Sequence, residues 1–144
     1  MKKLFAAILI MMNATAAEAG PDSDLLAKAG LLGAWAGNCS QPPSSDNPYQ
    51  VFAPSSSGYP TRVLKMDSKI DRTSEISNVR LLANNRVKFR MKASGDFDDR
   101  DIIAVVTGKR HRSLDAADAN GKKYVTNGKF PKGGETPWFE KCGR

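Results

Sequence analysis

The sequence predicts an all-β fold: a roughly eight-stranded antiparallel up-and-down barrel with a short N-terminal helix and one disulfide. Many short β-like segments lie at near-regular spacing and are separated by turn residues, a pattern typical of β-sandwiches and barrels. Only one stretch, near the N-terminus, has helical periodicity. The two cysteines, Cys39 and Cys142, lie near the two ends of the part that we expect to fold.

Residues 1–19 have the features of a secretory signal peptide. Lys2 and Lys3 precede the apolar run 4–12, and small residues in an A-x-A pattern follow it. The run is too short for a transmembrane helix, which needs about 20 apolar residues. We expect cleavage after Ala19, with Ala16 as the alternative. This leaves residues 20–144 as one domain and lowers the formal charge from +7 to +6, because two lysines and one glutamate leave. The expected product is a bacterial periplasmic or secreted monomer.

Export changes the interpretation of the cysteines. In an oxidising compartment two cysteines most simply form one disulfide, here Cys39–Cys142. A closed loop of about 100 residues stabilises a fold by about 4.7 kcal/mol in the chain-entropy model. The alternative is a reactive or metal-binding pair of thiols. The sequence has no C-x-x-C motif, and His111 is its only histidine, so we favour the disulfide.

The elements follow in a simple order. The helix is expected over residues 23–32, where Asp22 or Ser23 can cap it and Gly33 can end it. Its apolar face consists of Leu25, Leu26, Ala29 and Leu32. The expected strands are 34–40, 49–53, 61–66, 75–82, 86–93, 101–107, 110–116, 122–126 and 138–141. The strand 101–107 is apolar on both faces, and we expect the helix to cover it.

The hairpin around residues 83–85 has a register that the sequence can select. Val87 and Phe89 alternate with basic residues, so they face the core. A three-residue loop pairs Leu81 with Val87 and Val79 with Phe89, whereas a two-residue loop would mix apolar and basic faces. A three-residue loop needs a left-handed residue near its end, and Asn85 tolerates that conformation.

Residues 31–35 read L-L-G-A-W. The segment Gly33-Ala34-Trp35 resembles the G-x-W motif of the calycins, the group of lipocalins and related small secreted barrels. In that group the motif lies on the first strand after a short helix, and its Trp plugs the closed end of the barrel. The resemblance implies that Gly33 and Trp35 form such a plug, with Lys141 or Arg144 over the indole. The lipocalin T-D-Y motif is absent. The L-x-G-x-W start also resembles bacterial metalloprotease-inhibitor barrels.

These resemblances imply a non-catalytic, exported binding protein that holds a small apolar or amphipathic ligand inside a lipocalin-like barrel. The alternative is a protein-binding barrel, such as a protease or lysozyme inhibitor or an envelope-complex accessory protein. In that case side chains would fill the interior, as they do in many small barrels. We expect no cofactor, no metal and no catalytic set.

Basic side chains mark a candidate anion-binding face. One set alternates along residues 86–92 with Arg80 opposite, and a second set lies at residues 109–112. The members are Arg80, Arg86, Lys88, Arg90, Lys92, Lys109, Arg110 and Arg112. They predict contacts with anionic lipid or glycan, and the alternative is a solvated face that discourages edge pairing. Nucleic acid is not an expected partner, because exported proteins seldom meet it.

Three further features have a functional and a structural interpretation. Tyr49, Phe52 and Tyr59 flank the Pro- and Ser-rich loops, where they could line the barrel mouth, contact a partner or belong to the core. His111 has Ser113 on the same strand face, but no catalytic motif surrounds the pair. The acidic loops 96–99 and 115–121 lack calcium-loop spacing, and Asn120-Gly121 favours a hairpin turn.

Overall fold

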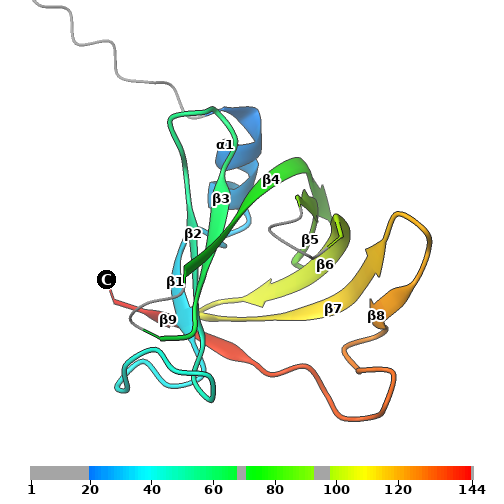
Figure 1. The fold of residues 1–144 in the computed structure, drawn as a ribbon. Helices are drawn as coiled ribbons and strands as arrows, with labels where there is room; N and C mark the ends of the chain where they lie inside the picture. The colour runs from blue at the N-terminus through cyan, green and yellow to red at the C-terminus, as the bar shows by residue number, and fades with distance from the viewer. Residues whose placement is uncertain (1–19, 68–70, 93–97, 144) are drawn as a thin grey trace, which may run out of the picture.

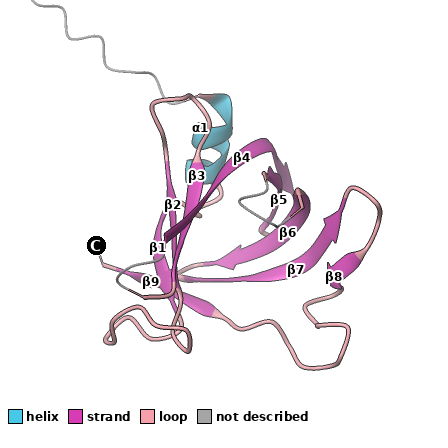
Figure 2. Cartoon of the chain, viewed as in Figure 1, coloured by secondary structure: helices cyan, strands magenta, loops and turns pink. Residues whose placement is uncertain are grey.

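The computed structural model describes residues 20–67, 71–92 and 98–143. The predicted signal peptide therefore lies outside the described residues. Figures 1 and 2 show one short helix and a strongly curved sheet. The elements are α1 (Pro21–Lys28), β1 (Gly33–Ala36), β2 (Tyr49–Ala53), β3 (Thr61–Lys65), β4 (Asp71–Leu82), β5 (Arg86–Met91), β6 (Arg100–Thr107), β7 (Arg110–Asp118), β8 (Lys123–Val125) and β9 (Phe139–Cys142).

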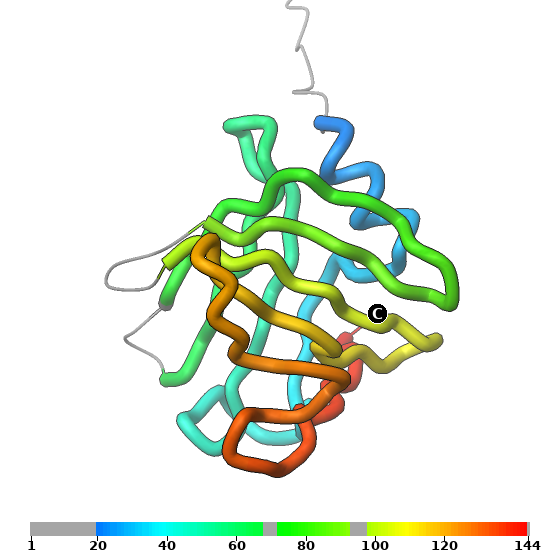
Figure 3. The backbone as a smooth tube through the Cα atoms, turned by 90° about the vertical axis from the view of Figure 1, so that its right-hand side faces the viewer, coloured from blue at the N-terminus to red at the C-terminus, as the bar shows by residue number. Residues whose placement is uncertain are grey.

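Eight of the nine strands close into an antiparallel barrel. Strands β1 to β7 follow one another around the wall in chain order, and β9 lies between β7 and β1 and completes the ring. The remaining strand, β8, pairs with the last part of β7 and lies outside the ring. Figure 3 shows how the β7–β8 hairpin and the following loop extend from the barrel wall. The predicted fold class is confirmed, with β8 as an addition to the ring.

The predicted disulfide is also confirmed. Cys39 and Cys142 are bonded, with their Cα atoms 5.3 Å apart and a sequence separation of 103. The bond fastens the segment after β1 to the end of β9. The strands β1 and β9 also pair with each other, with Ala34 opposite Cys142. No helix of the described part is long and apolar enough to cross a membrane.

The helix begins and ends earlier than the sequence analysis predicted. Gly20 is its N-cap and Pro21 occupies the first turn, a position that suits proline because its missing N–H would have no helical partner. Gly30 ends the helix with a φ of 76°. The amides of Gly30 and Leu31 donate to the carbonyls of Ala27 and Leu26, the two bonds of a Schellman motif. The prediction that Gly33 ends the helix was wrong, because Gly30 closes it three residues earlier.

The β4–β5 hairpin has the predicted three-residue loop but only part of the predicted register. Leu81 pairs with Val87, as expected, and Asn85 is left-handed with a φ of 56°. Further along, the register shifts between Ser77 and Arg80, so Asn78 and Val79 together oppose Phe89 in a β-bulge. Asn78 adopts a φ of 54°, which asparagine tolerates, and the bulge keeps Val79 in the core.

The helix does not cover β6, as the sequence analysis expected. It packs against β4 at one end of the barrel, where the Oδ1 of Asp22 accepts a hydrogen bond from the bulged amide of Val79 at 3.0 Å. In β6 the side chains of Ile102, Ala104 and Val106 are buried inside the barrel, while Ile103 and Val105 on the outer face are half-buried. We call the end beside α1 the helix end.

Other strand boundaries differ from the predicted ones by a few residues. β1 stops at Ala36 because the next residues join a loop around Asn47, whose side chain exchanges hydrogen bonds with the backbone of Asn38. β4 begins at Asp71 instead of residue 75, which lets it pair along the whole of β3. β7 runs to Asp118 and β8 shortens to three residues.

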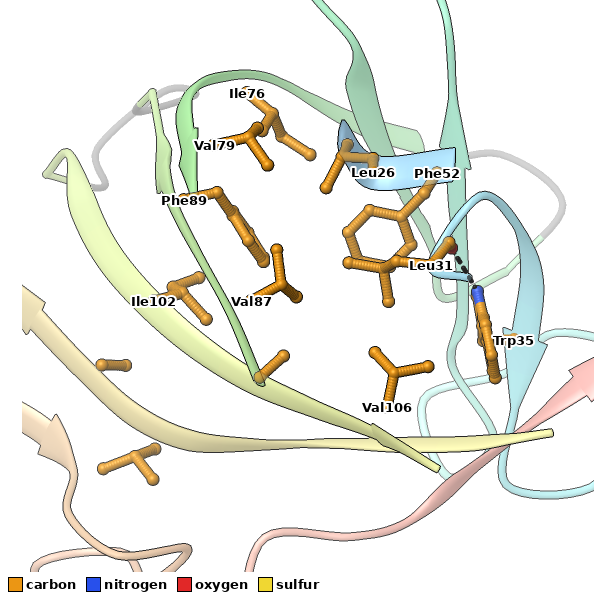
Figure 4. Close-up of a cluster of buried hydrophobic side chains, with 13 residues drawn as sticks. Leu26, Leu31, Trp35, Phe52, Ile76, Val79, Val87, Phe89, Ile102 and Val106 are labelled. Atoms are coloured by element: carbon orange, nitrogen blue, oxygen red, sulfur yellow. Dashed lines mark hydrogen bonds between the residues drawn. The ribbon is translucent and has the colours of Figure 1, made fainter. Parts of the chain in front are cut away.

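The core is one cluster of buried apolar side chains. Figure 4 shows that it gathers residues from α1, from the segment before β1 and from the surrounding strands. The cluster consists of Leu26, Leu31, Trp35, Phe52, Ile76, Val79, Val87, Phe89, Ile102, Ala104, Val106, Ala116 and Val125.

Candidate functional site: the inner wall of the barrel

Trp35 fills the barrel at the helix end. Its side chain is fully buried, and its Nε1 donates a hydrogen bond to the carbonyl of Leu31 at 2.8 Å (Figure 4). The Nζ of Lys141 lies 5.3 Å from the indole centre and donates to the carbonyl of Gly30. An ammonium over an indole face is attracted by the ring quadrupole. Lys141 therefore has the position that the sequence analysis left open between Lys141 and Arg144, and Arg144 lies outside the described residues.

Gly33 is required beside this pair for two physical reasons. Its φ of 127° lies in the region that favours glycine, and a Cβ at this position would meet the Cε of Lys141 at 3.0 Å. A larger residue would therefore push Lys141 away from Trp35. The G-x-W segment and Lys141 form one closing unit at the helix end.

His111 lies at the centre of an aromatic cluster on the inner wall. Its ring meets Trp35 edge-on at 4.7 Å and Phe52 edge-on at 5.8 Å, and it stacks on Phe139 at 5.4 Å. Burial, with a smaller contribution from the charge of Arg62, lowers the pKa of His111 from 6.5 to about 4. The imidazole is therefore neutral at physiological pH. Neither ring nitrogen has a hydrogen-bond partner, so no bond links it to Ser113.

Arg62 places a guanidinium on the same inner wall. Arg62 lies in β3, opposite Phe52 of β2 on one side and Ser74 of β4 on the other. Both neighbours are buried, so all three side chains share the inner face. The Nε of Arg62 is buried and has no hydrogen-bond partner. Burial, and secondly the charge of Arg100, lower the pKa of Arg62 to about 10. The side chain is therefore still a cation at neutral pH.

Arg100 is a second cation facing inward. It lies on the same face of β6 as the buried Ile102 and Ala104. Its guanidinium stacks on Tyr124, 3.7 Å from the ring centre. The nearby Asp118 is engaged in the β7–β8 turn. Its carboxylate accepts hydrogen bonds from two turn amides and from the Tyr124 hydroxyl.

Solvent reaches the inner wall away from the helix end. Gln50 pairs with the buried Trp35 and with Leu64, so both Gln50 and Leu64 face inward, yet they are only half-buried. Arg62 is half-buried as well. The inner wall thus combines fully buried apolar side chains near α1 with the half-buried side chains of Gln50, Arg62, Leu64 and Phe139.

Comparisons with protein-family models, curated proteins and solved structures give no match. The inner wall combines half-buried apolar side chains with positive charge, a composition that is compatible with a binding barrel. Among the described residues no group of three or more His, Cys, Asp or Glu side chains could hold a metal ion.

The basic stripe on β4 and β5 lies on the outer surface. Arg80 pairs with Lys88 across the sheet, and both are exposed. Arg90 forms a two-pronged ion pair with Asp101 at 2.9 and 3.1 Å, and Lys92 lies 3.7 Å from Glu75. The Nε of Arg86 donates a hydrogen bond to the carbonyl of Ala83 at 3.0 Å. A surface hollow of about 230 Å³ lies over Arg80, Lys88 and Arg90. Acidic neighbours therefore balance part of the stripe.

The second basic cluster divides between the two faces of β7. Arg110 and Arg112 face outward and both lie 4.8 Å from the ring centre of Trp138, so the indole is held between two guanidinium groups. Arg112 also lies 3.3 Å from a carboxylate oxygen of Glu135. Lys109 sits in the exposed β6–β7 turn, and its carbonyl accepts the amide of Lys141. His111, between the two arginines in sequence, faces inward.

The remaining sequence candidates separate in space. Phe52 belongs to the core, 3% exposed, and the hydroxyl of Tyr49 donates to loop carbonyls. Tyr59 is 50% exposed, but it lies in the β2–β3 turn at the helix end, away from the accessible part of the wall. The loop 115–121 forms the expected turn, with Gly121 at a φ of 82°. Asp96 and Phe97 of the other acidic loop lie outside the described residues.

Sequence reasoning missed the inward arginines for identifiable reasons. Arg62 lies between Thr61 and Val63 in a strand that carries apolar residues on both faces. The alternation of apolar and polar residues therefore could not predict which face of the strand Arg62 occupies. Arg100 was excluded because the predicted strand began at residue 101. Side chains two residues apart on a strand lie on the same face, so the position of Arg100 two residues before Ile102 could have placed it inside the barrel.

Proposed function

We propose that this protein is a non-catalytic binding barrel of the calycin type, which holds a small amphipathic ligand against its inner wall. The observation that carries this proposal is the composition of that wall. Leu64 and Phe139 supply half-buried apolar surface, and Arg62 supplies a half-buried cation on the same inner face. Ligand sites are typically concave and apolar, with a few placed polar groups that fix orientation.

The filled half of the barrel limits the size of the ligand. Trp35, Leu26 and Leu31 are fully buried and occupy the helix end, so a ligand has only the remaining half available. A short chain or a single ring system fits this description better than a long lipid. The disulfide and the predicted signal peptide support an exported protein, because disulfides persist in oxidising compartments.

A second candidate function is binding to another protein through the β8–β9 loop. Phe130 is 44% exposed in this loop. Its amide donates to the carbonyl of Gly134, its carbonyl accepts the amide of Gly133, and the hydroxyl of Thr136 anchors the loop to Ser113 at 2.7 Å. An exposed aromatic side chain on a hydrogen-bonded loop suits the contact that an inhibitor or accessory protein makes with its partner.

Native mass spectrometry of the protein purified from its own host tests both candidates. We expect a small-molecule adduct that is released on denaturation. Leu64→Trp, which fills the accessible wall, should remove the adduct, whereas Phe130→Ser should retain it. A protein complex that Phe130→Ser abolishes would favour the second candidate instead. A ligand-free monomer under all growth conditions would contradict both.

A further inference from the structure

Arg62 is the one arginine of β3, and its guanidinium faces the barrel interior. Its neighbours across the sheet, Phe52 and Ser74, are buried, and its charge acts on His111 inside the barrel. Its Nε is buried without a hydrogen-bond partner, and we find no ion pair to Arg62 within residues 20–67, 71–92 and 98–143. A guanidinium that is partly desolvated in this way is disfavoured when no anion compensates it.

The charged groups around Arg62 do not provide that anion. Arg100 carries the same sign and lowers the pKa of Arg62, and His111 is neutral. Asp118, which pairs with Arg100 across the sheet, already accepts two turn amides and the Tyr124 hydroxyl. On the outer surface the situation is different, since Arg90 and Arg112 each have a carboxylate within hydrogen-bond distance.

We infer that Arg62 binds the oxyanion group of the ligand, a carboxylate, sulfate or phosphate, from inside the barrel. This inference rests on the proposed function and specifies the ligand's charged group. The apolar part of the ligand then lies along Phe139 and Leu64, which are half-buried. An arginine suits this role because its planar guanidinium matches an oxyanion with two parallel hydrogen bonds.

Three probes with the same eight-carbon chain test the inference: octanoate, octyl phosphate and octanol. Each is titrated into the full chain by calorimetry. We expect the charged probes to bind about tenfold to a hundredfold more tightly than octanol, as a hydrogen bond to a charged group predicts. The better of the two charged probes identifies the oxyanion. Arg62→Met should remove this preference and leave octanol binding unchanged.

Two variants distinguish binding at the inner wall from binding at the outer surface. Arg90→Met makes the same change on the outer face, so it should keep the preference. If it removes the preference, or if salt abolishes it, the anion binds to the outer stripe and the inference is overturned. Arg62→Lys keeps the charge without the paired geometry, and it should bind the charged probes with intermediate affinity. This variant also serves if Arg62→Met fails to fold.

The stability of the ligand-free protein gives an independent result. Removing a half-buried cation that has no acidic partner should raise the urea midpoint of Arg62→Met, whereas an arginine with a purely structural role would lower it. A lower midpoint in both Arg62→Met and Arg62→Lys would therefore contradict the inference. Equal binding of all three probes would refute the anion site but keep the binding barrel. Absence of binding by any probe would count against the proposed function itself.

Discussion

Replacing Trp35 by phenylalanine should destabilise the protein far more than the same change at Trp138. The indole of Trp35 is fully buried and donates its only N–H to the carbonyl of Leu31 at 2.8 Å. Phenylalanine would leave that carbonyl without its donor, which costs about 1–3 kcal/mol, and the smaller ring would add a cavity. We therefore expect the free energy of unfolding to fall by about 2–4 kcal/mol, a large part of the stability of a typical domain.

Trp138 is the matched control because it is half-buried and lies between Arg110 and Arg112 on the outer surface. Phenylalanine retains most of that stacking, so Trp138→Phe should cost less than about 1 kcal/mol. Urea unfolding followed by far-ultraviolet circular dichroism measures both variants without relying on tryptophan fluorescence. With a typical urea dependence, Trp35→Phe should lower the midpoint by about 1–2 M. Equal shifts in the two variants would refute the closing role of Trp35.

Individual contacts give four further predictions. Gly33→Ala should destabilise by more than about 1 kcal/mol, because its Cβ meets Lys141 at 3.0 Å at a positive φ, and adding Lys141→Ala should recover only the steric part. Reducing Cys39–Cys142 should cost about 4–5 kcal/mol in urea unfolding for a loop of this length, and two alkylatable thiols in native, non-reduced protein would contradict the bond. Because folding lowers the pKa of His111 from 6.5 to about 4, the unfolded chain binds the extra proton between these values. Stability should then fall as pH drops through that window, by at most about 1.4 kcal/mol per pH unit, and a His111→Phe variant that keeps the full slope would refute this assignment. Lys88→Glu with Arg90→Glu should weaken salt-sensitive binding to anionic vesicles by about 1 kcal/mol per lost cation, and unchanged binding would leave the stripe as a solvated face.

The sequence was most informative where local chemistry decides the structure. The alternation around Val87 and Phe89 and the asparagines of the β4–β5 loop were sufficient to predict that hairpin near its turn. The bulge at Asn78 could not be predicted, because it depends on a contact between its neighbour Val79 and Asp22, which lies 57 residues earlier in the chain. The G-x-W segment indicated the closing residues, but only the barrel geometry selects Lys141 as the cation over the indole.

The inner wall was harder to predict because barrel closure determines its chemistry. Arg62, Arg100 and His111 come from β3, β6 and β7, and nothing in their sequence spacing indicates that Arg62 acts electrostatically on the other two. A sequence interpretation treats arginine and lysine as surface residues, which is correct for Lys88 and Arg90 but wrong for Arg62. The amino-acid composition therefore did not predict the inward-facing Arg62, on which the proposed function depends.

The division of the barrel into two halves has a consequence for mutation. The helix, Trp35 and Lys141 close one end of the barrel, whereas Arg62 lies half-buried on the inner wall, where burial lowers its pKa. Functional sites often keep groups that reduce stability, because ligand binding requires their charge. Substitutions at the helix end should therefore reduce stability and binding together. Removing the charge of Arg62 should raise stability while it lowers affinity for an oxyanion, a pattern that a purely structural barrel would not show.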